Sequence, residues 1–183
     1  MPFKMFDTSG LVIKSLRERI HDVDLMDVLV PVDSSPAVLD NENTRAVASA
    51  MVGAKQANAA TVLMYGAHVI RTGCSAYMIE LMKRGLVNHF ATNGAGSIHD
   101  FEFSLIGKTC ESVEKYIGEG QFGLWHETGM INDILKKGVE DGIGAGEAIG
   151  RYIWEMDLPY KKYSILANGY HFGVPCTIHI GIG

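Results

Sequence analysis

Short apolar segments alternate with longer amphipathic segments along the chain, and this alternation most restricts its fold. Strands are expected over 60–66 (ATVLMYG), 86–94 (LVNHFATNG) and 174–182 (VPCTIHIGI). Helices are expected over 45–58, 74–85, 97–107, 126–140, 146–156 and 161–173, with Asn43 or Thr44 as the cap of the first. Strands separated by helices of ten or more residues are typical of parallel βαβ units. We therefore predict an α/β fold, a parallel sheet with helices on both faces.

The length of 183 residues fits one domain, 1–183. Residues 1–40 are predicted to form an irregular arm with a short amphipathic piece near 11–20 and a turn cluster at 31–44 (PVDSSPAVLDNENT). Residues 106–125 show no clear pattern. The last expected strand runs into a glycine turn at the end of the sequence. Because buried strands normally lead into another element, we expect the natural chain to continue beyond Gly183.

The charge and the distribution of residues exclude several classes of protein. The net charge is −5 and no cluster of Lys and Arg stands out, which argues against a nucleic-acid partner. No segment of about 18 apolar residues is present, so we expect no membrane span. The 3 cysteines include no CxxC pair, which favours reduced thiols and a cytoplasmic protein.

Two strand-to-helix corners are the first candidate site. The segments YGAHVIRTG (65–73) and ATNGAGS (91–97) follow consecutive strands and contain small residues. In parallel sheets ligands bind at the carboxyl ends of strands, and helix N-terminal amides favour anions. Turn geometry alone also needs small residues here, so both interpretations stay open. A third glycine-rich segment, GIGAGEAIG (142–150), follows a charged helical stretch and is better explained as a helix start.

The histidines are the second candidate. His99 precedes Asp100, and His126 precedes Glu127, but neither pair has the HExxH spacing of a zinc site. An acid–base role for His99 or His126 is therefore the favoured interpretation, and a metal hydrolase that uses all four residues is the alternative. Trp125, in an irregular stretch, is a candidate pocket residue.

The two corners in succession resemble the deoxyhypusine synthase family. The resemblance lies in LMYGAHVIRTGCSAYMIELMKRGLVNHFATNGAGSIHDFEF (63–103) and more faintly in the tail ILANGYHFGVPCTIHIGIG (165–183). It implies an NAD-binding fold, a homotetramer with sites between subunits, and transfer of an aminobutyl group from a small-molecule amine. NAD would lie across the two corners. The cofactor contacts it implies are Ala67, His68, Thr72 and Gly73 in the first corner and Thr92, Asn93, Gly94, Ala95 and Gly96 in the second.

This chain departs from the family at two points. His99 and Asp100 occupy positions where the family has Glu and Asp, and Ile98-His99 replaces an acidic pair that would attract a polyamine. His68 replaces an Asn of the first loop. The family's catalytic lysine would fall beyond Gly183.

TNGA followed by IHD is also similar to the carboxy-terminal half of bifunctional arginine- and ornithine-degrading proteins. That resemblance implies NAD-dependent removal of ammonia from an amino acid such as ornithine. Both resemblances imply the same first step, in which NAD takes a hydride from a carbon bearing an amine and leaves an imine. We predict His99 for proton transfer, with Asp100 orienting it or binding the amine. A non-catalytic nucleotide-binding or assembly module is the other alternative, and the choice between NAD and NADP stays open.

Overall fold

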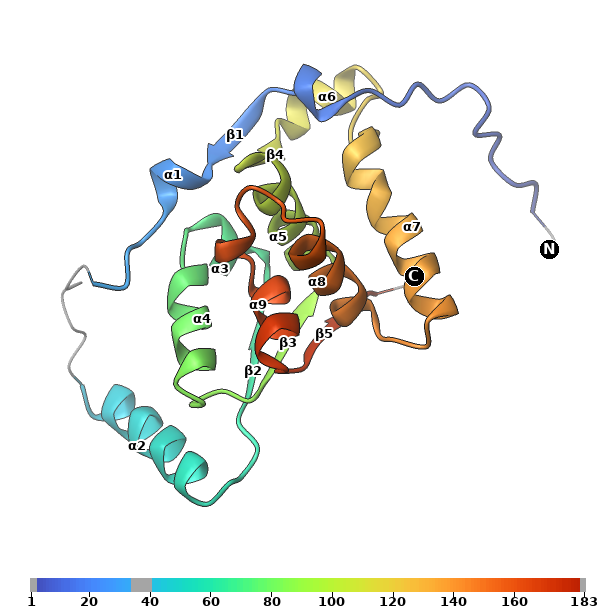
Figure 1. Ribbon diagram of the computed structural model, residues 1–183. Helices are drawn as coiled ribbons and strands as arrows, with labels where there is room; N and C mark the ends of the chain where they lie inside the picture. The colour runs from blue at the N-terminus through green and yellow to red at the C-terminus, as the bar shows by residue number, and fades with distance from the viewer. Residues whose placement is uncertain (1–2, 34–40, 182–183) are drawn as a thin grey trace.

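The computed structural model describes residues 3–33 and 41–181 (Figure 1). Its central sheet has three parallel strands in the order β2 (Val62–Tyr65), β3 (His89–Asn93) and β5 (Cys176–His179). A separate antiparallel pair joins β1 (His21–Asp24) to β4 (Lys108–Glu111). Helices flank the parallel sheet, so the predicted α/β class is confirmed.

The expected helices are present, with ends shifted by a few residues. The helical elements are η1 (Leu16–Glu18), α1 (Leu25–Val28), α2 (Glu42–Gln56), α3 (Ala67–Arg71), α4 (Ser75–Lys83), α5 (Gly94–Ile106), α6 (Val113–Gly118), α7 (His126–Glu140), α8 (Ala145–Glu155), η2 (Lys161–Tyr163) and α9 (Ile165–Phe172). None of those described has the length and apolarity to cross a bilayer.

The core lies between the sheet and its helices. Leu63, Tyr65 and Phe90 pack with side chains of α4 and α9 in one cluster. A second cluster joins Phe101 of α5 to apolar residues of α7, α8 and α9. Successive side chains of a strand point to opposite faces. Val62 and Met64 accordingly point away from the first cluster and are 53% and 81% exposed.

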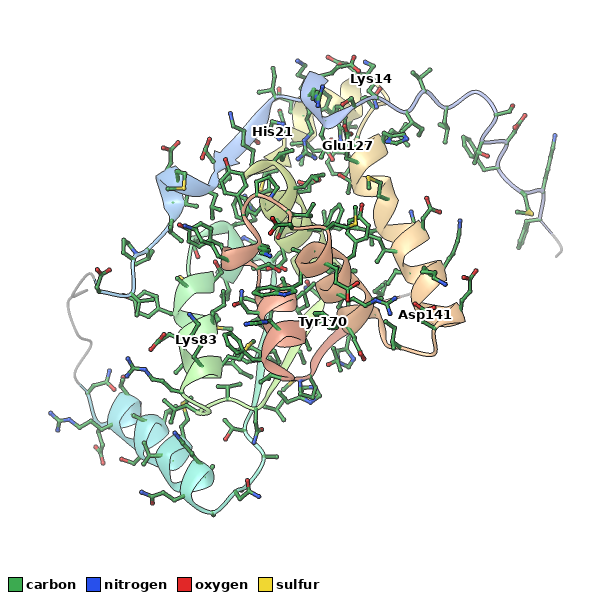
Figure 2. The ribbon with its side chains drawn as sticks, in the orientation of Figure 1. Lys14, His21, Lys83, Glu127, Asp141 and Tyr170 are labelled. Carbon is green, nitrogen blue, oxygen red and sulfur yellow. The ribbon has the colours of Figure 1, made fainter. Side chains whose placement is uncertain are left out.

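Residues 14–28 are ordered and packed, so the prediction of an irregular arm is wrong there. Lys14 forms a β-bridge with Trp125, and β1 pairs with β4. Leu16 and Leu25 are fully buried. The sequence HDVD has no apolar run that would predict a strand. It forms one because it pairs with β4, a segment more than 80 residues later. Figures 1 and 2 show this segment lying over α5, β4 and the start of α7.

Two further expectations concern the first corner and the uncertain segments. Residues 65–73, expected as a loop, contain the short helix α3. The centre of the predicted turn cluster, 34–40, and the last residue of the predicted strand, Ile182, lie outside the described residues.

Candidate functional site

The corner between β3 and α5 is closely packed. The Oδ1 atom of Asn93 caps α5 by accepting a hydrogen bond from the Gly96 amide at 2.8 Å. A Cβ atom on Gly96 would lie 2.1 Å from Oγ1 of Thr92, so only glycine fits without a shift. The amides of Gly94 and Ala95 fall in the first turn, where a helix offers them no internal acceptor. Such a turn favours an anionic group.

The predicted cofactor residues separate into two places. Since β2 and β3 are parallel and in register, the first residues of α3, Ala67 and His68, lie at the same sheet edge as 92–96. Thr72 and Gly73 lie at the opposite end of α3. The Thr72 hydroxyl donates to the His68 carbonyl at 2.8 Å, and a Cβ on Gly73 would meet the carbonyl of Val28 at 1.9 Å. Thr72 therefore closes the end of α3, and Gly73 allows the N-terminal segment to pack closely against it.

A pocket of about 620 Å³ opens beside the first turn of α5. One wall is the face of α5 that carries Ala95, Ile98, His99 and Glu102, next to Arg71 of α3. The other wall includes Arg19, Asp22, Cys110, Glu111, Ser112, Val113, Glu114, Phe122, Gly123, Trp125 and Thr128. The pocket thus joins the predicted cofactor corner to His99 and to charges of both signs.

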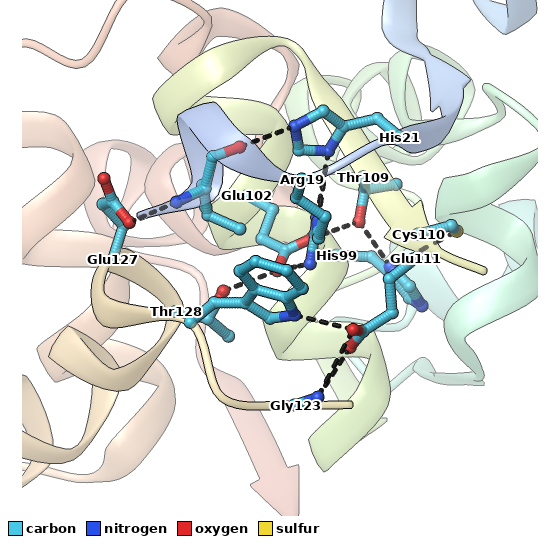
Figure 3. A network of polar contacts seen from close by, with 12 residues as sticks. Arg19, His21, His99, Glu102, Thr109, Cys110, Glu111, Gly123, Glu127 and Thr128 are labelled. Carbon is cyan, nitrogen blue, oxygen red and sulfur yellow. Dashed lines mark hydrogen bonds and ion pairs between the residues drawn. The ribbon is translucent and has the colours of Figure 1, made fainter. Parts of the chain in front are cut away.

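The most densely bonded group in this pocket is the carboxylate of Glu102, which is 1% exposed (Figure 3). Arg19 donates to both oxygens, from Nη1 to Oε1 at 3.0 Å and from Nη2 to Oε2 at 2.6 Å. The hydroxyls of Thr109 and Thr128 donate to it at 2.7 and 2.6 Å. Burial alone would raise the pKa of Glu102, but the Arg19 charge and these hydrogen bonds lower it below its usual value. We call these four residues the Glu102 cluster.

His99 is attached to this cluster. Its Nδ1 lies 2.7 Å from Oγ1 of Thr109, and Sγ of Cys110 lies 3.9 Å from the same nitrogen. Burial lowers the pKa of His99, the nearby Glu102 charge opposes this, and Arg71 and Arg19 lower it further. The imidazole is therefore neutral at pH 7, as a proton acceptor must be.

Asp100 faces the opposite side of α5. It is 2% exposed and accepts hydrogen bonds from the Ser164 hydroxyl and from the amides of Ile165 and Leu166, at the start of α9. Burial raises the pKa of Asp100 to about 6, although these hydrogen bonds lower it. The structure thus uses this carboxylate to hold α9, and Thr109 takes the place beside His99 that we had expected for Asp100.

The alternative metal set is not assembled. His126 is exposed, and the Glu127 carboxylate accepts hydrogen bonds from the Ser15 hydroxyl at 2.6 Å and the Leu16 amide at 2.7 Å. Within 3–33 and 41–181 no group of three or more His, Cys, Asp or Glu side chains could hold a metal ion. Trp125 lines the pocket as predicted but is also 2% exposed core, with its Nε1 donating to Glu111 at 2.6 Å.

A comparison with protein-family models finds a match for this chain. Residues 45–149, more than half of the chain, match the model described as arginine dihydrolase ArgZ-like, C-terminal, Rossmann fold.

The chain belongs to this ArgZ-like family. The match supports a Rossmann-like fold, and Rossmann folds commonly bind nucleotide cofactors at the carboxyl ends of their strands. No curated protein matches the chain.

The matched ArgZ-like segment contains both corners, His99, Glu102 and Thr109, but not Arg19. Sequence reasoning had missed the whole Glu102 cluster. Glu102 lies three residues after His99, which places both on one face of the helix. This spacing could have marked Glu102 as a neighbour of His99. Arg19 and Thr109 gave no such signal, because tertiary pairing of β1 with β4 brings them to α5.

Proposed function

We propose that this ArgZ-like chain is an NAD-dependent enzyme that oxidises a carbon bearing an amino group in a small molecule. The observation that carries the proposal is one continuous pocket that reaches from the first turn of α5 to a half-buried histidine whose pKa is lowered. Oxidation of an amine carbon needs a bound hydride acceptor next to a group that can take a proton. The pocket offers a place for each.

The residues at the corner fit a dinucleotide. The amides of Gly94 and Ala95 suit a pyrophosphate, and Gly96 lets the helix approach the strand closely. The buried Oγ1 of Thr92 has no hydrogen-bond partner among the described residues and can contribute a further polar contact. Ala67 and His68 would line the same edge. NAD would supply the hydride acceptor there.

The charges of the pocket favour an amino acid over a polyamine. Arg71 is half-buried, and its buried Nε has no partner among the described residues, so it can hold a carboxylate. Asp22, Glu111 and Glu114 in the opposite wall can attract an ammonium group. His99 then accepts the proton that leaves as the amine becomes an imine.

We therefore favour deamination of an amino acid such as ornithine over aminobutyl transfer of the deoxyhypusine type. The family match to arginine dihydrolase ArgZ-like proteins supports this choice. In deamination the imine is hydrolysed, or a second amine attacks it and the hydride returns. Ammonia leaves in either case. The tetramer and the single-domain organisation stay part of the proposal, and sedimentation of the full chain tests the first.

The test begins with binding. Millimolar NAD should raise the melting temperature of the purified chain, and titration calorimetry should give a saturable isotherm. Incubation with ornithine and NAD should release ammonia, without net NADH if the hydride returns. A polyamine serves as the matched substrate for the transfer alternative. Absence of both a thermal shift and a calorimetric signal with NAD and NADP would refute the proposal and favour a module without catalysis.

A further inference from the structure

The protonation state of Glu102 decides how its neighbours share their hydrogens. Its carboxylate receives four donors from three residues, and a lowered pKa keeps it ionised at neutral pH. An ionised carboxylate has no hydrogen to donate. In the 2.7 Å contact between Thr109 and Glu102, the hydrogen therefore belongs to the threonine.

Thr109 has a single hydroxyl hydrogen, and the contact with Glu102 uses it. Its Oγ1 also lies 2.7 Å from Nδ1 of His99. In this second contact the threonine oxygen must accept, so Nδ1 of His99 must carry a hydrogen. The reverse arrangement would turn the hydroxyl away from a buried charge, and its population should be lower by roughly tenfold or more.

A neutral imidazole with hydrogen on Nδ1 has its lone pair on Nε2. We propose that Glu102, acting through Thr109, fixes His99 in this tautomer and so presents Nε2 to the pocket as a proton acceptor. Thr109 and Glu102 are positioning residues, and Arg19 holds Glu102 in place with two hydrogen bonds. The assignment of the tautomer stands on the hydrogen bonds of an ionised Glu102 and a neutral His99, whereas the role of Nε2 in turnover rests on the proposed function.

The same chain of contacts also explains how His99 can accept a charge. When Nε2 takes a proton from a substrate ammonium group, one N–H bond breaks, another forms, and the imidazole becomes cationic. The Nδ1 hydrogen stays on its bond to Thr109, whose hydroxyl points to the Glu102 carboxylate. The negative charge of the buried Glu102 then stabilises the cation on the half-buried His99, and the proton returns to water or product afterwards.

Nitrogen-15 NMR of the full-length chain at pH 7, with and without NAD, tests the tautomer directly. The His99 signals are identified by their loss in His99→Gln. Wild type should show Nδ1 protonated and Nε2 unprotonated. Thr109→Val, which keeps the shape of the side chain, should lose this preference, and Thr109→Ser should restore it.

Thr128→Val is the matched control, because it also removes a hydroxyl that donates to Glu102 but forms no hydrogen bond with His99 in the described structure. Its His99 signals should match wild type. A wild-type His99 that is cationic or protonated on Nε2 overturns the proposal, and so does a Thr109→Val spectrum equal to wild type. If Thr109→Val does not fold, the wild-type spectrum alone decides.

Turnover of an amine provides the second measurement. Thr109→Val should lower kcat by roughly tenfold to a hundredfold with KM within about threefold, and Thr109→Ser should recover most of the loss. An unchanged kcat in Thr109→Val overturns the catalytic use of the tautomer. Failure of every amine to react would count against the proposed function alone, since the NMR result does not depend on turnover.

Discussion

The two faces of α5 carry two buried carboxylates that the protein treats in opposite ways. Asp100 faces α9, and burial raises its pKa to about 6. Glu102 faces the pocket, and its pKa is lowered despite burial. Both accept several hydrogen bonds, but only Glu102 has a cation, Arg19, at contact distance. The opposite pKa shifts of the two carboxylates therefore arise from the buried counter-charge beside Glu102 and not from the number of hydrogen bonds.

This difference assigns each face a task. The Asp100 face holds together α5, α9 and the sheet, and its polar atoms are used within the fold. The Glu102 face holds an ionised group beside a pocket, where its charge can act on His99. Each prediction below changes one face and compares it with a matched position elsewhere.

Removal of the cation should have the largest effect. Arg19→Ala leaves the ionised Glu102 buried without its partner, which should lower the free energy of unfolding by roughly 3–5 kcal/mol. Urea denaturation measures it. Arg17→Ala, two residues away and exposed, should stay within about 0.5 kcal/mol of wild type. If Glu102→Gln does not recover part of the loss in the double variant, the buried charge is not its cause.

Removal of the other carboxylate should matter somewhat less. Asp100→Ala leaves the first amides of α9 without an acceptor in the protein, and the free energy of unfolding should fall by roughly 2–3 kcal/mol. Asp133→Ala breaks an exposed ion pair with Lys136 and should change stability by less than about 0.5 kcal/mol. NAD binding by the folded Asp100→Ala protein should persist; its complete loss would contradict the separation of the two faces.

The corner glycine should show an intermediate effect. Gly96→Ala drives a Cβ atom against Thr92, so stability should fall by roughly 1–2 kcal/mol. NAD should also bind more weakly, because the first turn of α5 must move away from the strand. In Gly129→Ala the new Cβ, at the end of the first turn of α7, meets no neighbour within 4 Å. That control should gain roughly 0.5–1 kcal/mol, and the pair of variants is compared by thermal unfolding and calorimetry.

The dependence of stability on pH should have opposite signs for the two carboxylates. The folded pKa of Asp100, about 6, exceeds the unfolded value of 3.8, so its contribution falls as pH rises from 4 to 6. The folded pKa of Glu102 is below 4.5, so its contribution is present above that pH and is lost as pH falls through the folded pKa.

Two variants read out these slopes. Relative to wild type, the destabilisation by Asp100→Asn should shrink between pH 4 and 7, whereas that by Glu102→Gln should grow from pH 3 to 6. Urea denaturation across this range measures both. Parallel pH profiles for the two variants would show that the counter-charge does not distinguish the faces.

Much of the fold followed from local patterns. The periods of the apolar residues located β2, β3, β5 and the main helices, and the parallel sheet followed from their alternation. The N-cap of α2 is Asn41 and not Asn43 or Thr44 as the cap residues had indicated, since several neighbouring polar residues can cap a helix start equally well. The segments β1, β4 and α6 were missed, because short strands that depend on distant partners carry little local signal.

The sequence predicted the corner between β3 and α5 but not the buried residues that surround His99. Asn93 to Gly96 and His99 could be found because a strand end and a helix start are local features. Asp100 seemed a natural partner for His99 by adjacency, yet neighbours in a helix point about 100° apart. The real partner, Thr109, comes from β4, and Arg19 from a segment that no local pattern had marked.

The N-terminal segment has one consequence for how this domain is divided. The match to the family model begins at residue 45. The cation that keeps Glu102 ionised is Arg19, and Leu16 and Leu25 of the same segment are fully buried. The segment that the family model matches is therefore smaller than the unit that forms the pocket. A graft of residues 45–149 alone onto another protein would carry His99 and Glu102 without Arg19, the cation that balances the Glu102 charge.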